Sequence, residues 1–175
     1  MTIRLLVAIA PTASATPPVV DAQQVWKNTA GDTDFNAGTS WVSGIAPGAG
    51  DVGAFTAAVV AQPNLSASLS ISGLYFDGTG TSGYDLTRTS TQTLTLSATS
   101  TTIGTEIGDT TAVAIGGENT SGTNTIDVPI ILAPNTGSSS TIFQAGGGTL
   151  TLNGAISGSG IGITKTGSGT LVLTG

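Results

Sequence analysis

Apolar and polar residues alternate along two short segments near the carboxyl-terminal end of the sequence. The segments are Thr149-Leu150-Thr151-Leu152 and Thr170-Leu171-Val172-Leu173. Because neighbouring side chains of a strand point to opposite faces, the two leucines of each segment share one face. Glycines lie at both ends of each segment and supply the backbone freedom that a sharp corner needs. We therefore predict two short strands, each with one buried face.

The two segments belong to one internal repeat. Residues 146–154 and 167–175 lie 21 positions apart and are identical at six positions: Gly146/Gly167, Gly148/Gly169, Thr149/Thr170, Leu150/Leu171, Leu152/Leu173 and Gly154/Gly175. A strand this short cannot bury its apolar face alone, so repeated units of this kind bury it by stacking on each other. We predict that Leu171 stacks over Leu150 and that Leu173 stacks over Leu152.

The 21-residue period discriminates between two all-β architectures. At about 3.3 Å per residue the period spans up to about 70 Å, enough to circle a small three-sided coil and return one strand spacing higher. This path is that of a parallel β-helix, or β-solenoid. An antiparallel β-sandwich or meander would instead pair strands about 8 to 12 residues apart. A strand predicted at residues 161–163 keeps this alternative open.

Alternation recurs through residues 57–175, which we predict to form the solenoid. Further strands are predicted at residues 69–71, 74–76, 84–86, 93–96, 126–128 and 130–132. The least regular part is residues 97–124, in which four residues are expected to point inward: Ile103, Ile107, Val113 and Ile115. No helical periodicity stands out along the chain.

Aromatic residues gather ahead of this region. Trp26 and Trp41, the two tryptophans of the chain, and two of its four phenylalanines, Phe35 and Phe55, all lie in residues 25–56. A large apolar group before a repetitive region predicts an N-terminal aromatic cap, since the ends of repeat arrays need capping. The alternative is that the tryptophans are exposed platforms for sugar rings.

The first residues of the chain resemble an export signal. Arg4 provides a positive start, residues 5–10 form a short apolar run, and Ala13-Ser14-Ala15 has the small-x-small form of a cleavage site. We predict a signal peptide at residues 1–15 and an extended linker at residues 16–24. The sequence has no apolar run of about 18 residues, so we expect no membrane-spanning helix.

Composition excludes several kinds of function. Lys and Arg number 4 against 10 Asp and Glu, for a net charge of −6, which argues against nucleic-acid binding because phosphate contacts need clustered cations. Cysteine and histidine are both absent. Disulfides, thiolate or imidazole metal sites, and nucleophilic systems that depend on histidine are therefore excluded.

One acidic stretch has the alternate spacing of a calcium loop. Asp32, Asp34 and Asn36 could offer oxygen ligands, but the loop glycine, Gly38, is displaced by one position and Ser43 stands where a glutamate is needed. Turns made by Asp and Asn side chains explain the same residues more simply. We therefore predict no calcium site here.

Other candidate chemistry is sparse. Glu106 and Asp109 are near each other without a cationic partner, and the glycines of residues 146–148 and 158–160 lack the helix and lysine of a phosphate loop. We predict no catalytic, cofactor-binding or metal-binding residues. Threonines in residues 87–95 leave an ice-binding face as a minor alternative. Lys165 is expected to discourage edge-to-edge strand pairing.

A family resemblance rests mainly on the carboxyl-terminal repeat. The segments Gly154-Ala155-Ile156-Ser157-Gly158-Ser159-Gly160 and Thr164-Lys165-Thr166-Gly167-Ser168-Gly169-Thr170-Leu171-Val172-Leu173-Thr174-Gly175 resemble the autotransporter-associated β-strand repeat of bacterial surface proteins. The segment that often precedes such repeats is similar to the pattern formed here by Trp26, Asp34-Phe35-Asn36, Trp41, Gly44, Pro47, Asp51 and Phe55. Residues 71–78 resemble the intervening region.

The resemblance implies a right-handed parallel β-helix that is secreted or held at the cell surface. The expected function is structural or adhesive, without catalysis, in a passenger that continues beyond residue 175 towards the outer membrane. Expected partners are host or environmental glycans or proteins, with end-to-end or edge association. Two alternatives stay open, a carbohydrate-active β-helix enzyme and a glycan-binding module.

Overall fold

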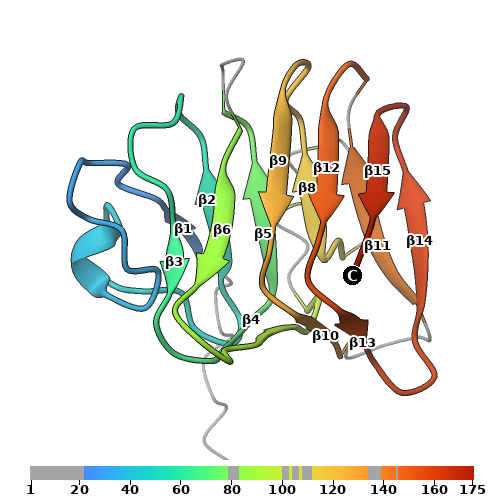
Figure 1. Cartoon of the computed structure of the whole chain (residues 1–175), viewed down its shortest axis with the longest axis horizontal. Coiled ribbons are helices and arrows are strands. Elements are labelled where there is room, and N and C mark those ends of the chain that lie inside the picture. The colour runs from blue at the N-terminus through green and yellow to red at the C-terminus, as the bar shows by residue number, and fades with distance from the viewer. Residues whose placement is uncertain are drawn as a thin grey trace, which may run out of the picture.

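The protein is all-β and is built from three parallel sheets (Figure 1). The computed structural model describes residues 22–78, 83–99, 103, 107, 112–133, 139–144 and 146–175. The predicted signal peptide, the linker up to residue 21, Glu106 and Asp109 lie outside these residues. In the described part, helical structure is limited to a 3-10 turn, η1 (Gly38–Ser40), and an isolated position at residue 103.

The strands visit the three sheets in turn. The six-stranded sheet has the order β1 (Gln23–Val25), β2 (Val52–Phe55), β5 (Gly73–Phe76), β8 (Ile115–Gly117), β11 (Ser139–Gln144) and β14 (Gly162–Thr166). The five-stranded sheet has the order β15 (Thr170–Leu173), β12 (Thr149–Leu152), β9 (Thr123–Ile126), β6 (Asp85–Arg88) and β3 (Asn64–Leu65). The four-stranded sheet has the order β13 (Ile156–Ser157), β10 (Ile130–Leu132), β7 (Leu94–Leu96) and β4 (Leu69–Ile71).

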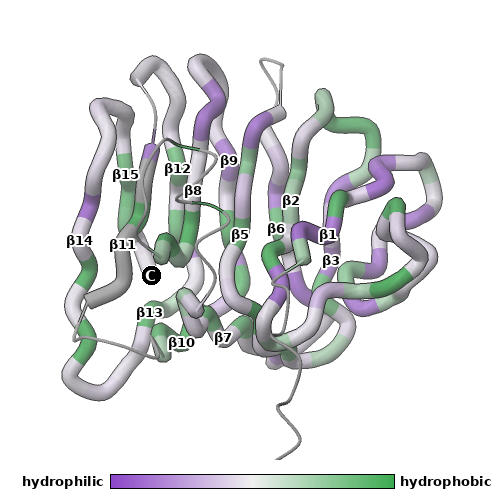
Figure 2. Tube along the Cα trace, turned by 180° about the vertical axis from the view of Figure 1, so that it is seen from behind, coloured by the Kyte–Doolittle hydropathy of each residue, from purple (hydrophilic) through white to green (hydrophobic). Residues whose placement is uncertain are grey.

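The predicted stacking of the repeat is confirmed. β12 and β15 pair in parallel with Leu150 beside Leu171 and Leu152 beside Leu173. Every pair of named strands in the described residues is parallel. The antiparallel sandwich or meander is therefore wrong for this part of the chain. Figure 2 shows apolar positions recurring along β12 and β15.

The spacing between paired strands varies because one connection leaves the sheets. Thr149 pairs with Thr170, 21 residues later, whereas Leu74 pairs with Ile115, 115 − 74 = 41 residues later. The additional chain includes Ile103 and Val113, which are buried with Val52, Ala54 and Tyr75 in a second apolar cluster. Strand alternation puts this cluster on the six-stranded sheet face opposite the main core.

The expectation for residues 97–124 is thus wrong in part. Ile115 belongs to the main core, but Ile103, Ile107 and Val113 pack in the second cluster. A β-carbon at position 116 would lie 2.4 Å from Ile103 Cγ2, so glycine is required for this close approach. An isoleucine side chain can be buried on the inner face of a sheet or on its outer face. The spacing of apolar residues in the sequence cannot distinguish these two positions.

Trp26, Phe35, Trp41 and Phe55 pack together in one apolar cluster. They come from the part of the chain around β1 and β3, which are end strands of their sheets (Figure 1). Ring centroids are 5.2 Å apart for Trp26 and Trp41 and 4.8 Å apart for Phe35 and Trp41, both edge-on. Phe55 stacks on Phe76 at 5.0 Å and joins the group to the core of the next strands. The apolar end is therefore closed by the chain's own side chains.

A buried amide cluster lies within the core and was not anticipated. Asn124 Nδ2 donates to Asn119 Oδ1 at 2.9 Å, and Gln144 Nε2 donates to the same oxygen at 3.2 Å. Asn124 Oδ1 in turn accepts the backbone N–H of Tyr84 at 2.9 Å. Buried polar groups of this kind are tolerated because they are hydrogen-bonded, and they favour one register of the strands that they join.

Candidate functional surface

The outer face of the five-stranded sheet carries two columns of threonine side chains. Thr149 pairs with Thr123 on one side and with Thr170 on the other, and Thr151 pairs with Thr125. The residues between them, including Leu150 and Leu152, are buried, so alternation directs the threonines outward. Strands lie about 4.7–4.9 Å apart, so hydroxyl and methyl groups recur regularly across this face. We call these five threonines the threonine face.

A ladder of hydrogen-bonded polar side chains borders the threonine face. Asn153 Nδ2 donates to Asp127 Oδ1 at 2.8 Å, and the Thr174 hydroxyl donates to Asn153 Oδ1 at 2.7 Å. In the earlier strands, Asn64 Nδ2 donates to the Thr87 hydroxyl at 2.8 Å. Because these side chains bond to each other across strands, they stabilise the border in one arrangement.

The ice-binding alternative is wrong about which threonines share a face. Thr87 lies in β6 of the five-stranded sheet, whereas Thr95 lies in β7 of the four-stranded sheet. Residues 87–95 therefore turn a corner and do not form one flat face. The threonine face instead uses β9, β12 and β15, and the Thr-x-Thr pattern of β9 and β12 is the sequence signal that could have located it.

Two pairs of carboxyl groups lie between neighbouring strands. Burial, followed by the charge of Asp127, raises the pKa of Asp85, and one Asp85 oxygen is buried without a hydrogen-bond partner. Burial, followed by the charge of Glu118, raises the pKa of Asp77, while the Tyr75 hydroxyl donates to Glu118 Oε2 at 2.5 Å. Each pair has like charges, which repel at neutral pH.

The acidic stretch near the N-terminal end forms turns. Asp34 Oδ1 accepts the Asn36 backbone N–H at 2.9 Å and the Ser66 hydroxyl at 2.7 Å. Asp32 pairs with the Lys27 ammonium at 3.0 Å. These oxygens bond to the chain itself, which favours the interpretation as turns. Within the described residues, no group of three or more His, Cys, Asp or Glu side chains is arranged to hold a metal ion.

The tryptophan platform proposed from the sequence is wrong. Trp26 and Trp41 are 3% and 1% exposed, so neither ring can stack on a sugar. Trp41 Nε1 donates to the Phe35 carbonyl at 2.9 Å, which holds the ring in place. The two indoles are buried because they cover the end of the core. Exposing their large apolar area to water would cost free energy.

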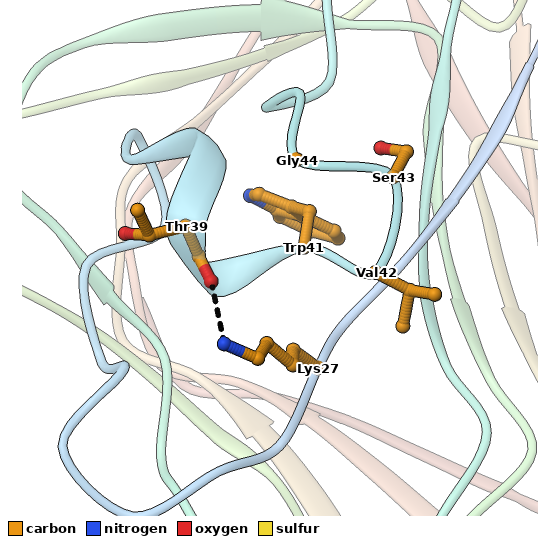
Figure 3. A pocket seen from close by; sticks show the side chains of 6 residues that line it. All are labelled: Lys27, Thr39, Trp41, Val42, Ser43 and Gly44. Atoms are coloured by element: carbon orange, nitrogen blue, oxygen red, sulfur yellow. Dashed lines mark hydrogen bonds between the residues drawn. The ribbon is translucent and has the colours of Figure 1, made fainter.

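A shallow hollow remains beside Trp41 (Figure 3). It measures about 430 Å³, and its walls are formed by Lys27, Thr39, Trp41, Val42, Ser43 and Gly44. The Lys27 ammonium donates to the Thr39 carbonyl at 3.4 Å and pairs with Asp32, so it is already engaged by the loop. The hollow therefore offers little for a polar ligand.

Lys165 lies in an edge strand, which is the position required if it discourages edge-to-edge strand pairing. β14 is the last strand of the six-stranded sheet, and Lys165 pairs there with the buried Ile142. Its ammonium donates to the carbonyls of Thr166 at 3.2 Å and Gly167 at 2.6 Å. A cation thus occupies the position where the next inward apolar side chain would be expected.

The chain contains two sequons for N-glycosylation, Asn64-Leu65-Ser66 and Asn119-Thr120-Ser121, and they differ in accessibility. Asn64 is half-buried and its amide bonds to Thr87, while Asn119 is 7% exposed and belongs to the amide cluster. Neither side chain is a free acceptor in the folded protein.

No helix in the described part of the chain is long and apolar enough to span a membrane.

Comparisons with protein-family models, with curated protein sequences and with solved structures find no significant match to this chain.

Proposed function

We propose that this protein is a right-handed parallel β-solenoid that serves as a secreted or cell-surface structural or adhesive element. The order in which successive strands enter the three parallel sheets supports the solenoid. Right-handedness follows from the strong preference of parallel crossover connections for that hand. The aromatic residues of residues 25–56 act as the N-terminal cap of the array.

The threonine face is the observation that best supports an adhesive role. Its threonines recur on three neighbouring strands and carry no charge. β-Branched threonines have stiff side chains, so their hydroxyls lose little entropy when they bind a surface. The resemblance to autotransporter-associated repeats supports export and display at the bacterial surface.

Retention on coated surfaces tests this role. The protein is passed over immobilised glycans and extracellular proteins, and its retention is compared with that of Thr149→Glu/Thr151→Glu. Two carboxylates on the threonine face should lower affinity about tenfold or more through desolvation. Ser70→Glu is the control, since Ser70 is exposed on the outer face of the four-stranded sheet.

The outcomes distinguish adhesion from the carbohydrate-active alternative. Retention that the double variant loses and Ser70→Glu keeps supports adhesion through the threonine face. Equal retention of all three proteins, or none, refutes it. The carbohydrate-active alternative is supported instead if the protein shortens a polysaccharide, because adhesion alone leaves the glycan chain length unchanged.

A further inference from the structure

The sequence contains a single Asn-Gly pair, Asn153-Gly154. Asparagine followed by glycine loses ammonia more readily than other asparagines, because glycine has no β-carbon to keep its backbone nitrogen away from the asparagine side chain. The pair directly follows β12, which lies between β9 and β15 in the five-stranded sheet (Figure 1). Its reactivity therefore depends on how the neighbouring strands hold these two residues.

The reaction requires the Gly154 backbone nitrogen to attack Cγ, the side-chain carbonyl carbon of Asn153. A bond forms between these two atoms and the bond from Cγ to Nδ2 breaks, so that Nδ2 departs as ammonia with the proton of the Gly154 nitrogen. Water then adds to either carbonyl carbon of the five-membered imide and opens it. The product is aspartate, or isoaspartate, in which the main chain runs through the side chain.

Two hydrogen bonds restrain the Asn153 side chain in the folded protein. Nδ2 donates to Asp127 Oδ1 at 2.8 Å, and Oδ1 accepts the Thr174 hydroxyl at 2.7 Å. These partners follow β9 and β15, the strands on either side of β12. Because both ends of the amide are engaged, Cγ can turn towards the Gly154 nitrogen only after these bonds break.

The attacking nitrogen is restrained as well. The Gly154 N–H donates to the Ile126 carbonyl at 3.1 Å, and the Asn153 N–H donates to the same oxygen at 2.9 Å. Gly154 is buried, and a β-carbon added there would overlap the Val128 carbonyl. A corner packed this closely leaves little room for the backbone rotation that the attack needs. The folded state therefore protects both reacting groups.

We propose that Asn153 is a modification site, which converts spontaneously to aspartate or isoaspartate when the corner after β12 opens. The closed corner suppresses the reaction, so the modified fraction records how often the corner has opened. The product does not restore the ladder, because the new carboxylate has no N–H to donate at neutral pH and repels the Asp127 carboxylate. The site is independent of the proposed adhesive function.

Mass spectrometry of the complete protein tests the proposal. The protein is incubated at mildly alkaline pH, either folded in buffer or unfolded in urea, and modification of Asn153 is followed with time by peptide fragmentation. Enzymatic methylation of isoaspartate identifies the second product. We expect the folded protein to react at least about tenfold more slowly than the unfolded protein, because the reaction requires local opening.

Asp127→Ala tests the contribution of the ladder. It removes the acceptor of the Asn153 amide, so the folded variant should react about threefold faster or more, the effect of one net hydrogen bond. Asp127→Asn keeps an oxygen that can accept the same bond and should retain most of the protection. Asp77→Ala is the control, because it removes a carboxyl group beside Glu118, after β5 of another sheet. Circular dichroism checks that each variant is folded.

Five results would overturn the proposal. These are no modification of Asn153 in urea, equal rates for the folded and unfolded wild-type protein, no acceleration in Asp127→Ala, the same acceleration in Asp127→Asn as in Asp127→Ala, and the same acceleration in Asp77→Ala. The first two comparisons use the wild-type protein alone, so they decide the proposal even if Asp127→Ala does not fold.

Discussion

The column of stacked leucines allows a quantitative test of where the core ends. Leu150 is fully buried and lies between Asn124 of β9 and Leu171 of β15. Leu171 stands in the same column but is only half-buried, because no described strand covers its other side. Truncating each leucine to alanine therefore removes the same atoms from two different environments.

The two substitutions should differ in cost by about 2 kcal/mol or more. Leu150→Ala leaves a cavity between two strands, and buried leucine truncations cost about 2–5 kcal/mol. Leu171→Ala removes side-chain surface that water already reaches in part, and its cost should be about 1 kcal/mol. Thr151→Ala, on the outer face beside Leu150, is the control and should change stability by no more than about 0.5 kcal/mol.

Urea denaturation followed by circular dichroism measures the three free energies of unfolding at one temperature. The denaturant slope should stay constant in all variants, since a changed slope would mean that the denatured state has changed as well. Equal costs for Leu150→Ala and Leu171→Ala would refute the burial argument, as would a larger cost for Leu171→Ala. Leu171→Asp adds a kinetic check, because amide exchange should then accelerate first in β15; unchanged exchange there would show that Leu171 is not packed inward.

Three further predictions concern other parts of the molecule. The folded state favours the protonated forms of Asp77 and Asp85, because the pKa values of both carboxyl groups are raised. The contribution of these two groups to the free energy of unfolding should therefore grow as the pH falls towards about 3.9, the pKa of an unfolded Asp, and be lost as the pH rises. Asp85→Asn should flatten this dependence in urea titrations, and an unchanged profile would contradict it. Asn124→Ala should cost about 1–3 kcal/mol by leaving the buried Tyr84 N–H without its acceptor; thermal unfolding can check this, and an unchanged stability would contradict it. Trp26 and Trp41 are buried, so tryptophan fluorescence should be blue-shifted and resist quenching by acrylamide and oligosaccharides; strong quenching in the native state would show that the rings are accessible.

The local sequence pattern was sufficient to predict strand pairing where the sequence of one strand repeats that of another. The alternation in residues 149–152 and 170–173, together with their 21-residue spacing, correctly predicted parallel pairing and the two leucine contacts. Period-two alternation assigns each side chain to a face, and a slip by one residue would exchange the two faces. The glycine corners followed as well, with Gly147 at φ 86° and Gly167 at φ 74°.

The candidate surfaces were harder to predict, because sequence proximity is not spatial proximity in stacked sheets. Thr87 and Thr95 are close in sequence but belong to different sheets, whereas Thr123, Thr149 and Thr170 are distant in sequence and adjacent in space. The exposed-platform interpretation of the tryptophans failed for a related reason. An aromatic residue looks the same in sequence whether it binds a ligand or closes a core.

In the repeat, alternation and the glycines at its corners were therefore sufficient to predict the strands, the inward position of the leucines and the parallel stacking. Tertiary packing sets which residues leave the sheets and pack on the outside, as Ile103 and Val113 do. It also decided that Asn119, Asn124 and Gln144 meet in the core, since their hydrogen bonds join residues up to 25 positions apart. Such contacts form because packing and hydrogen bonding depend on distance in space, which no local pattern encodes.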